Sequence, residues 1–94
     1  MTNDLNQALD ALNGWTRVET PTSAIEKSFV FKDFKQAWAF MSYVALCADA
    51  LNHHPNWSNV YNQVHIRLTT HDAGGLSLQD VALAQQIDAY LTSY

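Results

Sequence analysis

The sequence has little of what marks several classes of protein, and each shortage excludes one of them. A single cysteine among 94 residues cannot form an intrachain disulfide, which favours a reducing, cytoplasmic location. Five basic residues against nine acidic ones give a net charge of −4, so no nucleic-acid-binding surface is expected. No apolar run is long enough to span a bilayer, and the N-terminal residues lack the basic and apolar segments of a signal peptide.

What is present is typical of a globular protein. Hydrophobic residues make up 48% of the chain and aromatic ones 12%, whereas there are only three glycines and two prolines. This composition is too apolar for a disordered chain. A chain of this length lies near the lower limit for burying a self-sufficient core, so we expect residues 1–94 to form a single domain.

The spacing of apolar residues predicts an α+β fold. They recur every three or four residues in some segments and alternate with polar ones in others. The expected helices cover 3–12, 34–51 and 77–94, and the expected strands cover 15–19, 25–32, 57–61 and 63–70. The order α-β-β-α-β-β-α favours a four-stranded antiparallel sheet with three helices packed on one face. The edges of such a sheet make pairing between subunits feasible.

Two histidines follow the expected central helix directly, as His53 and His54. Pro55 cannot continue a helix and disfavours the helical conformation of His54, so the pair is expected where this helix ends. Outside a helix, adjacent side chains diverge, so one ring can enter a pocket while the other holds its rim. Alternatively, His53 contacts the last carbonyls of the helix. Asp49, four residues before His53, can reach that ring or remain solvated.

Two further polar residues are candidates for the same site. His71 lies between the last strand and a glycine-containing loop, where functional side chains are often presented. Asp80 has capping-box spacing with Ser77, and it also begins the apolar stripe of the last helix, so it is expected to cap this helix, to face inward, or to do both. His65, in the middle of a strand, is interpreted as a solvated residue.

Metal binding is a weaker interpretation of these histidines than acid–base chemistry. Three histidines and an aspartate are a feasible zinc-ligand set, but adjacent histidines converge poorly on one ion. The sequence has neither an HExxH motif nor a cysteine pair, and no nucleophile elbow, P-loop or dinucleotide fingerprint. We therefore expect no metal and no cofactor.

The stretch from Phe29 to Ile87 resembles the pterin-4a-carbinolamine dehydratase family. The matching segments include FVFKDFKQAWAFM, ALNHHPNW and TTHDAGG, and the spacing carries the resemblance. The positions that match the family's active-site signature are Asp49, His53, His54, Pro55, Tyr61, His71 and Asp80. Many members have glutamate where Asp49 stands.

The resemblance implies an enzyme that works without a cofactor. Family members dehydrate the 4a-hydroxytetrahydropterin left by aromatic amino acid hydroxylases, giving quinonoid dihydropterin. By this analogy His53 and His71 are acids for the leaving hydroxyl, and His54 binds the pterin and helps as a base. The residues expected to line the pocket with hydrogen-bonding groups are Asn52, Thr69, Thr70 and Asp72. Asp49 and Asp80 would orient the imidazoles, and Trp57 is either a wall of the site or a core or surface aromatic.

The resemblance also implies partners. The family forms dimers and tetramers, so a homodimer or homotetramer is expected, with a pterin as substrate and an aromatic amino acid hydroxylase as a further candidate partner. Some relatives instead serve as non-enzymatic partners, as a dimerisation cofactor or as an accessory in assembly. The complete histidine set favours the enzyme.

Overall fold

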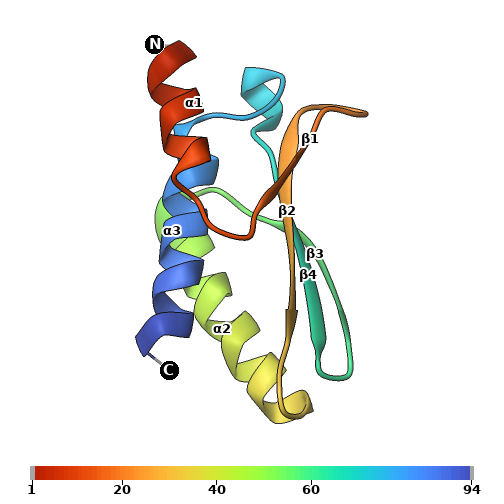
Figure 1. Ribbon diagram of the computed structural model, residues 1–94. Coiled ribbons are helices and arrows are strands. Elements are labelled where there is room, and N and C mark those ends of the chain that lie inside the picture. The colour runs from red at the N-terminus through yellow and green to blue at the C-terminus, as the bar shows by residue number, and fades with distance from the viewer. Residues whose placement is uncertain (1, 94) are drawn as a thin grey trace.

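Three helices and one antiparallel sheet build the molecule (Figure 1), which a computed structural model describes for residues 2–93. In chain order the elements are α1 (Thr2–Asp10), β1 (Thr16–Val18), β2 (Ala24–Val30), α2 (Phe34–Leu51), β3 (Asn56–Val60), β4 (Gln63–Leu68), the 3₁₀ helix η1 (His71–Ala73) and α3 (Leu78–Ser93). The predicted order of helices and strands is confirmed. The bounds differ by a few residues, and Tyr94, the expected end of the last helix, lies outside the described residues.

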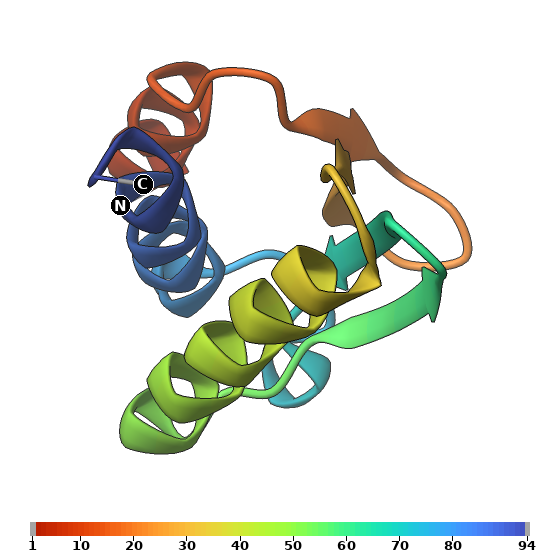
Figure 2. The ribbon, with the colours of Figure 1, turned by 90° about the horizontal axis from the view of Figure 1, so that it is seen from below.

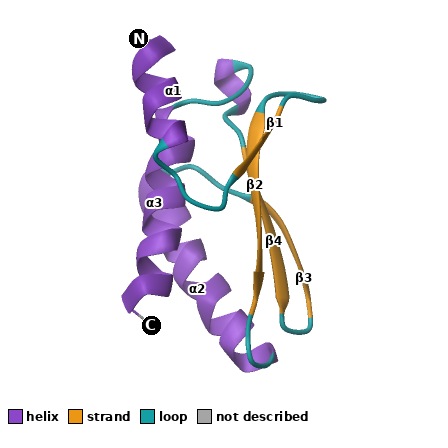
Figure 3. Ribbon diagram, in the orientation of Figure 1, coloured by secondary structure: helices purple, strands orange, loops and turns teal. Residues whose placement is uncertain are grey.

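The helices form one layer and the sheet the other. All three helices cover the same face of the sheet, while its other face is open (Figures 2 and 3). The strands lie in the order β1-β2-β4-β3, and every neighbouring pair is antiparallel. The predicted fold class is therefore confirmed. No helix within residues 2–93 is long and apolar enough to cross a membrane.

The core lies between these layers. Strand β4 alternates strictly, with Val64, Ile66 and Leu68 buried, because successive side chains of a strand point to opposite faces. From α2, the fully buried Phe40 packs its ring 4.9 Å from the ring of Phe29. Burying such a side chain contributes about 1.5–3 kcal/mol to stability.

Helix α2 is bounded at both ends by its own side chains and backbone. Asp33 caps its start, where Oδ1 accepts the backbone N–H of Gln36 at 2.9 Å. At the other end Asn52 adopts a left-handed conformation with φ of 52°, and its N–H bonds back to Ala48 and Asp49. The helix thus stops before Pro55, and Asn52 sets the direction in which the chain leaves.

The β3–β4 hairpin brings two distant segments together. Its turn consists of Tyr61 and Asn62, and the ladder pairs Asn56 at the start of β3 with Arg67 near the end of β4. Because the strands are antiparallel, the residues just before β3 and those just after β4 meet at the same end of the sheet. These are the segments that carry His53, His54 and His71.

Candidate active site

A cavity of about 350 Å³ lies at this end of the sheet. It is lined by Asn52, His53, His54, Thr69, Thr70, His71, Asp72 and Gln79. The lining comes from the cap of α2, from the chain after β4 and from the first turn of α3. All the residues predicted to line a pocket therefore do so, and three of the chain's four imidazoles share this hollow.

His53 is buried and bound to a carboxylate. Its Nε2 lies 2.5 Å from Oδ1 of Asp80, and its side chain is only 9% exposed. Its backbone N–H, not its ring, bonds to the carbonyl of Ala48 at the end of α2. Of the two interpretations left open by the sequence, the structure therefore supports a ring directed away from the helix end and towards the cavity.

Asp80 has both of the roles that its position predicted. It is fully buried in the first turn of α3, where its Oδ2 accepts the backbone N–H of Ser77 at 3.0 Å and so caps the helix. The same Oδ2 accepts the hydroxyl of Thr70 at 2.8 Å, while Oδ1 faces His53. A carboxylate at a helix N-terminus is also favoured by the helix dipole.

Of the two interpretations of Asp49, the contact with His53 is wrong and the solvated position is confirmed. Oδ1 of Asp49 lies 3.3 Å from Nε2 of His54 instead of contacting His53. The spacing argument applied helical geometry to a residue that lies beyond the expected end of the helix, and Asn52 turns the chain into a left-handed conformation before His53. The contact is exposed, with side-chain accessibilities of 61% for His54 and 85% for Asp49, so it holds the ring weakly at the rim.

A closed turn carries His71. Strand β4 ends at Leu68, two residues before the expected end, and His71 begins η1 as an exposed residue. The turn is closed by two backbone hydrogen bonds between Thr70 and Gly75. Gly75 is required here, because a Cβ at this position would lie 2.3 Å from Oγ of Ser23.

Two threonines behave differently from the expectation, and Trp57 takes the second of its two expected roles. The Thr69 hydroxyl donates to the carbonyl of Ser23 at 2.8 Å, and the Thr70 hydroxyl is bound to Asp80. Neither hydroxyl therefore has a proton left to donate to a ligand, although both residues line the cavity. Trp57 does not line it and packs against the hydrophobic core from β3.

Gln79 is a lining residue that the sequence analysis missed. It lies in the first turn of α3, directly before Asp80, and its side chain is exposed. The sequence contained the signal for Gln79, because the capping pair Ser77 and Asp80 marks the start of the helix. Gln79 lies between these two residues and therefore in the first turn. An amide side chain there adds both a hydrogen-bond donor and an acceptor to the cavity.

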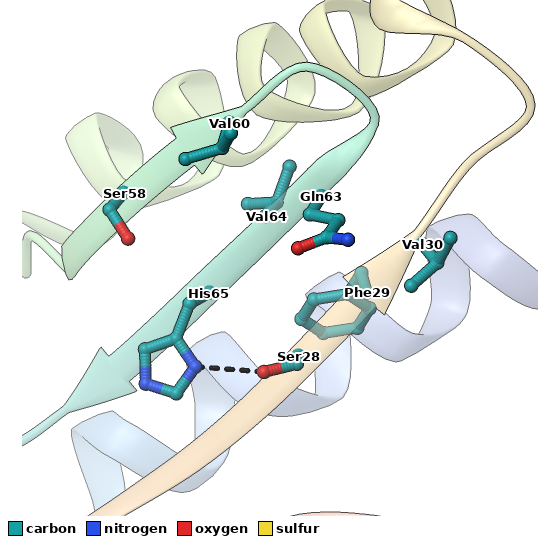
Figure 4. A pocket seen from close by; sticks show the side chains of 8 residues that line it. All are labelled: Ser28, Phe29, Val30, Ser58, Val60, Gln63, Val64 and His65. Atoms are coloured by element: carbon teal, nitrogen blue, oxygen red, sulfur yellow. Dashed lines mark hydrogen bonds between the residues drawn. The ribbon is translucent and has the colours of Figure 1, made fainter.

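His65 lies on the open face of the sheet, as predicted, away from the cavity (Figure 4). Its Nδ1 is 2.9 Å from Oγ of Ser28 and its Nε2 is 3.4 Å from Glu26. Ser28, His65 and Glu26 resemble a serine–histidine–acid arrangement only in composition, and the hollow of about 120 Å³ beside them is lined by Ser28 and His65 but not by Glu26. Strand β4 pairs with β2 on one side and β3 on the other, so its backbone N–H groups are not available to stabilise an oxyanion.

Within residues 2–93, no three histidine, cysteine, aspartate or glutamate side chains are grouped so as to hold a metal ion. The cavity lined by His53, His54 and His71 combines imidazole, carboxylate and amide groups around a space large enough for a small ring system. Such a set of groups can bind a polar heterocycle and transfer protons to and from it.

Comparison with known proteins agrees with this chemistry. The model of one family, described as pterin 4 alpha carbinolamine dehydratase, matches residues 1–90. The chain belongs to this family. Within the dehydratase family, a protein from Rhizorhabdus wittichii that bears the name provisionally is 57% identical over 82 residues, which are 87% of this chain and 84% of the relative. The pterin-4-alpha-carbinolamine dehydratase of Drosophila melanogaster is 54% identical over 84 residues, covering 89% of this chain and 42% of that longer protein.

A solved member of the dehydratase family has the same fold. The crystal structure of a transcriptional coactivator/pterin dehydratase from Brucella melitensis superposes with a TM-score of 0.85 at 43% identity, covering 95% of this chain and 94% of the other. The predicted family resemblance is therefore confirmed, and the family is named for pterin dehydratase activity.

Proposed function

We propose that this protein dehydrates a 4a-hydroxytetrahydropterin to the quinonoid dihydropterin, using its histidines as acid and base. The observation that carries the proposal is that His53, His54 and His71 line one cavity although they come from two separate segments of the chain. Imidazole is the side chain whose unperturbed ionisation lies near neutral pH, so it can both donate and accept protons there.

The reaction is a loss of water with no change in oxidation state. The bond between C4a and the hydroxyl oxygen breaks, and a protonated imidazole supplies the proton that lets the hydroxyl leave as water. The proton on N5 passes to a base, and the electrons of that N–H bond form the new C=N bond. Positioned proton transfer of this kind contributes about 10²–10⁴-fold to a rate. The reaction as written requires no cofactor.

The environments of the histidines support different roles for them. His53 is buried and its ring is held by Asp80, which suits an acid that must donate its proton from a fixed position. His71 approaches from the closed turn after β4 and is assigned as the second acid. His54, exposed and only loosely held by Asp49, is assigned to binding the pterin and to assisting as a base.

The remaining polar groups suit recognition of the flat ring. Asn52, Asp72 and Gln79 line the cavity, and among residues 2–93 their side chains form no hydrogen bond that would withdraw them from a ligand. Amide and carboxylate groups match the donors and acceptors on the edge of a pterin. Thr69 and Thr70 contribute walls to the cavity, but their hydroxyl protons are already donated within the protein.

A direct assay tests the proposal. Chemically prepared 4a-hydroxytetrahydropterin is mixed with the protein in a stopped-flow instrument, and formation of the quinonoid product is followed between pH 5 and 9. We expect acceleration over the protein-free reaction, with a rate that changes around neutral pH because the acid and base must be in opposite protonation states.

Two results would count against it. If the protein gives no acceleration at any pH, it is not a dehydratase for this substrate. If it accelerates the reaction by the same factor from pH 5 to 9, the imidazoles are not the proton donors and acceptors, and the assignment of roles is wrong even though the activity is real.

A second candidate function is that of a non-enzymatic binding partner. The solved relative from Brucella melitensis carries a double description as coactivator and dehydratase. On α2, Trp38 is 57% exposed and Leu46 is 72% exposed, and exposed apolar side chains of this size favour association. Lack of catalysis together with tight binding of another protein would favour this function.

The same exposed side chains support a homo-oligomer, which we propose in either the dimeric or the tetrameric form. Sedimentation velocity over a hundredfold range of concentration is expected to show a species larger than the 10.6 kDa chain. A single monomeric boundary throughout that range would contradict it.

A further inference from the structure

The hydroxyl groups of Thr70 and Ser77 form a chain with one direction. A hydroxyl has a single proton, and Thr70 donates its proton to Oδ2 of Asp80 at 2.8 Å because an ionised carboxylate only accepts. Oγ of Ser77 lies 2.6 Å from Oγ1 of Thr70 and must therefore be the donor in that contact. The backbone N–H of Gln79 in turn donates to Ser77 at 3.3 Å.

This chain fixes the carboxylate of Asp80 in one orientation. Oδ2 receives two donors, the Thr70 hydroxyl and the Ser77 N–H, while Oδ1 is left to face Nε2 of His53. Asp80 is fully buried and Thr70 is 9% exposed, so water does not readily replace a lost partner. Rotation of the carboxylate would break these bonds.

An oriented acceptor selects one tautomer of the imidazole. With Oδ1 of Asp80 at 2.5 Å, the proton of neutral His53 resides on Nε2. Nδ1 of His53 has no hydrogen-bond partner among residues 2–93. Every fully buried side-chain nitrogen or oxygen in this range does have a partner, so Nδ1 is not fully buried. Because His53 lines the cavity, Nδ1 is open to it. Nδ1 carries a proton only when the ring is charged, so it is the nitrogen that gives a proton to a bound molecule as the imidazolium and is left without one in the neutral ring.

Thr70 also belongs to the turn that carries the third histidine. Its backbone N–H and carbonyl form both hydrogen bonds to Gly75, and His71 is the next residue along the chain. One residue thus connects the partner of His53 with the base of the turn that presents His71.

We propose that Thr70 and Ser77 are positioning residues that act through Asp80 to keep a proton on Nε2 of His53, so that Nδ1 is directed at the substrate. Nδ1 then donates its proton from the charged ring and is unprotonated in the neutral ring, which is the Nε2-protonated tautomer. The proposal rests on the proposed dehydratase function, and it assigns the two hydroxyls to orienting the acid instead of binding the pterin.

The tautomer is measured without any substrate. In protein labelled with ¹⁵N at histidine, the neutral His53 ring is expected to show a protonated Nε2 and an unprotonated Nδ1. Thr70→Val removes the hydroxyl while keeping the branched shape, and we expect a mixture of tautomers. Thr70→Ser retains the hydroxyl and is expected to restore the wild-type pattern.

Kinetics provide the second measurement. Thr70→Val is expected to lower kcat by about tenfold or more, the scale of one hydrogen bond to a charged group, and to change KM by less than about twofold. Thr70→Ser is expected to stay within about twofold of wild type in both. If Thr70→Val does not fold, as judged by circular dichroism, Ser77→Ala takes its place, with a smaller effect expected in the same direction.

Either of two results would overturn the proposal. One is a wild-type ring protonated on Nδ1; the other is a folded Thr70→Val protein with the wild-type tautomer and kcat. Absence of dehydration by the wild-type protein would instead reject the proposed function, and the NMR comparison would still decide how the two hydroxyls act on His53.

Discussion

A His53→Ala variant is expected to dehydrate 4a-hydroxytetrahydropterin about 10²–10⁴-fold more slowly than the wild-type protein, the range typical of losing a positioned proton donor. The reason is specific to this ring. His53 is the buried imidazole with a carboxylate at 2.5 Å, so no water molecule in bulk solvent can supply a proton from the same fixed position. The measurement is kcat by stopped flow, after circular dichroism has shown that the variant is folded.

His71 and His54 are tested together because both are exposed and each alone allows partial replacement by solvent. The double variant His54→Ala/His71→Ala is expected to lose at least as much activity as His53→Ala. His65→Ala is the matched control, since it removes an exposed imidazole on the open face of the sheet, outside the cavity. That control is expected to retain wild-type kcat.

The site assignment fails if the double variant keeps its activity. It also fails if His65→Ala loses as much activity as His53→Ala, because the effect would then reflect the loss of any histidine and not the loss of a particular one.

The largest expected effect on stability comes from Asp80→Ala, which should lower the free energy of unfolding by about 3–5 kcal/mol, because leaving each buried donor without its acceptor costs about 1–3 kcal/mol. The carboxylate binds three partners at once, namely the His53 ring, the Thr70 hydroxyl and the N–H of Ser77, the residue directly before α3. All of them are left without a buried acceptor when it is removed. Equilibrium unfolding in urea gives the value.

Two further variants test whether the loss of stability comes from the buried acceptor at Asp80. Asp80→Asn keeps an oxygen for the Ser77 N–H and is expected to lose less stability than the alanine variant. Asp49→Ala breaks the exposed contact with His54 and is expected to leave the free energy of unfolding nearly unchanged, because solvent screens that pair. Equal losses from Asp49→Ala and Asp80→Ala would show that the buried network does not stabilise the fold.

Much of the fold could be predicted because local patterns and tertiary packing agree. The alternation of Val64, Ile66 and Leu68 and the long apolar stripe of α2 both depend on which side of an element faces the core, and the sequence alone contains that information. The capping roles of Asp33 and Asp80 were predictable for a similar reason, since a helix start needs an acceptor for its free N–H groups.

The partners of the two adjacent histidines could not be predicted from spacing. The pairing of His53 with Asp80 joins residues 27 positions apart, and it exists because the antiparallel hairpin and the start of α3 converge at one end of the sheet. The spacing of four residues indicates a contact between Asp49 and His53 only within a helix, and the chain leaves the helix at Asn52. The engaged hydroxyls of Thr69 and Thr70 are likewise a property of the folded chain, since their partners Ser23 and Asp80 lie on other segments.

Because α2 ends at the left-handed cap of Asn52, the number of residues in this helix sets the direction in which the chain leaves it. Each helical residue rotates the chain by about 100°, so deleting or inserting one anywhere between the Asp33 cap and Asn52 would swing the emerging segment by that angle and carry His53 off Asp80. Substitutions on the exposed side of this helix are tolerable, but changes in its length are not. Homologues that retain the contact between His53 and Asp80 are expected to keep the same number of residues between the two caps.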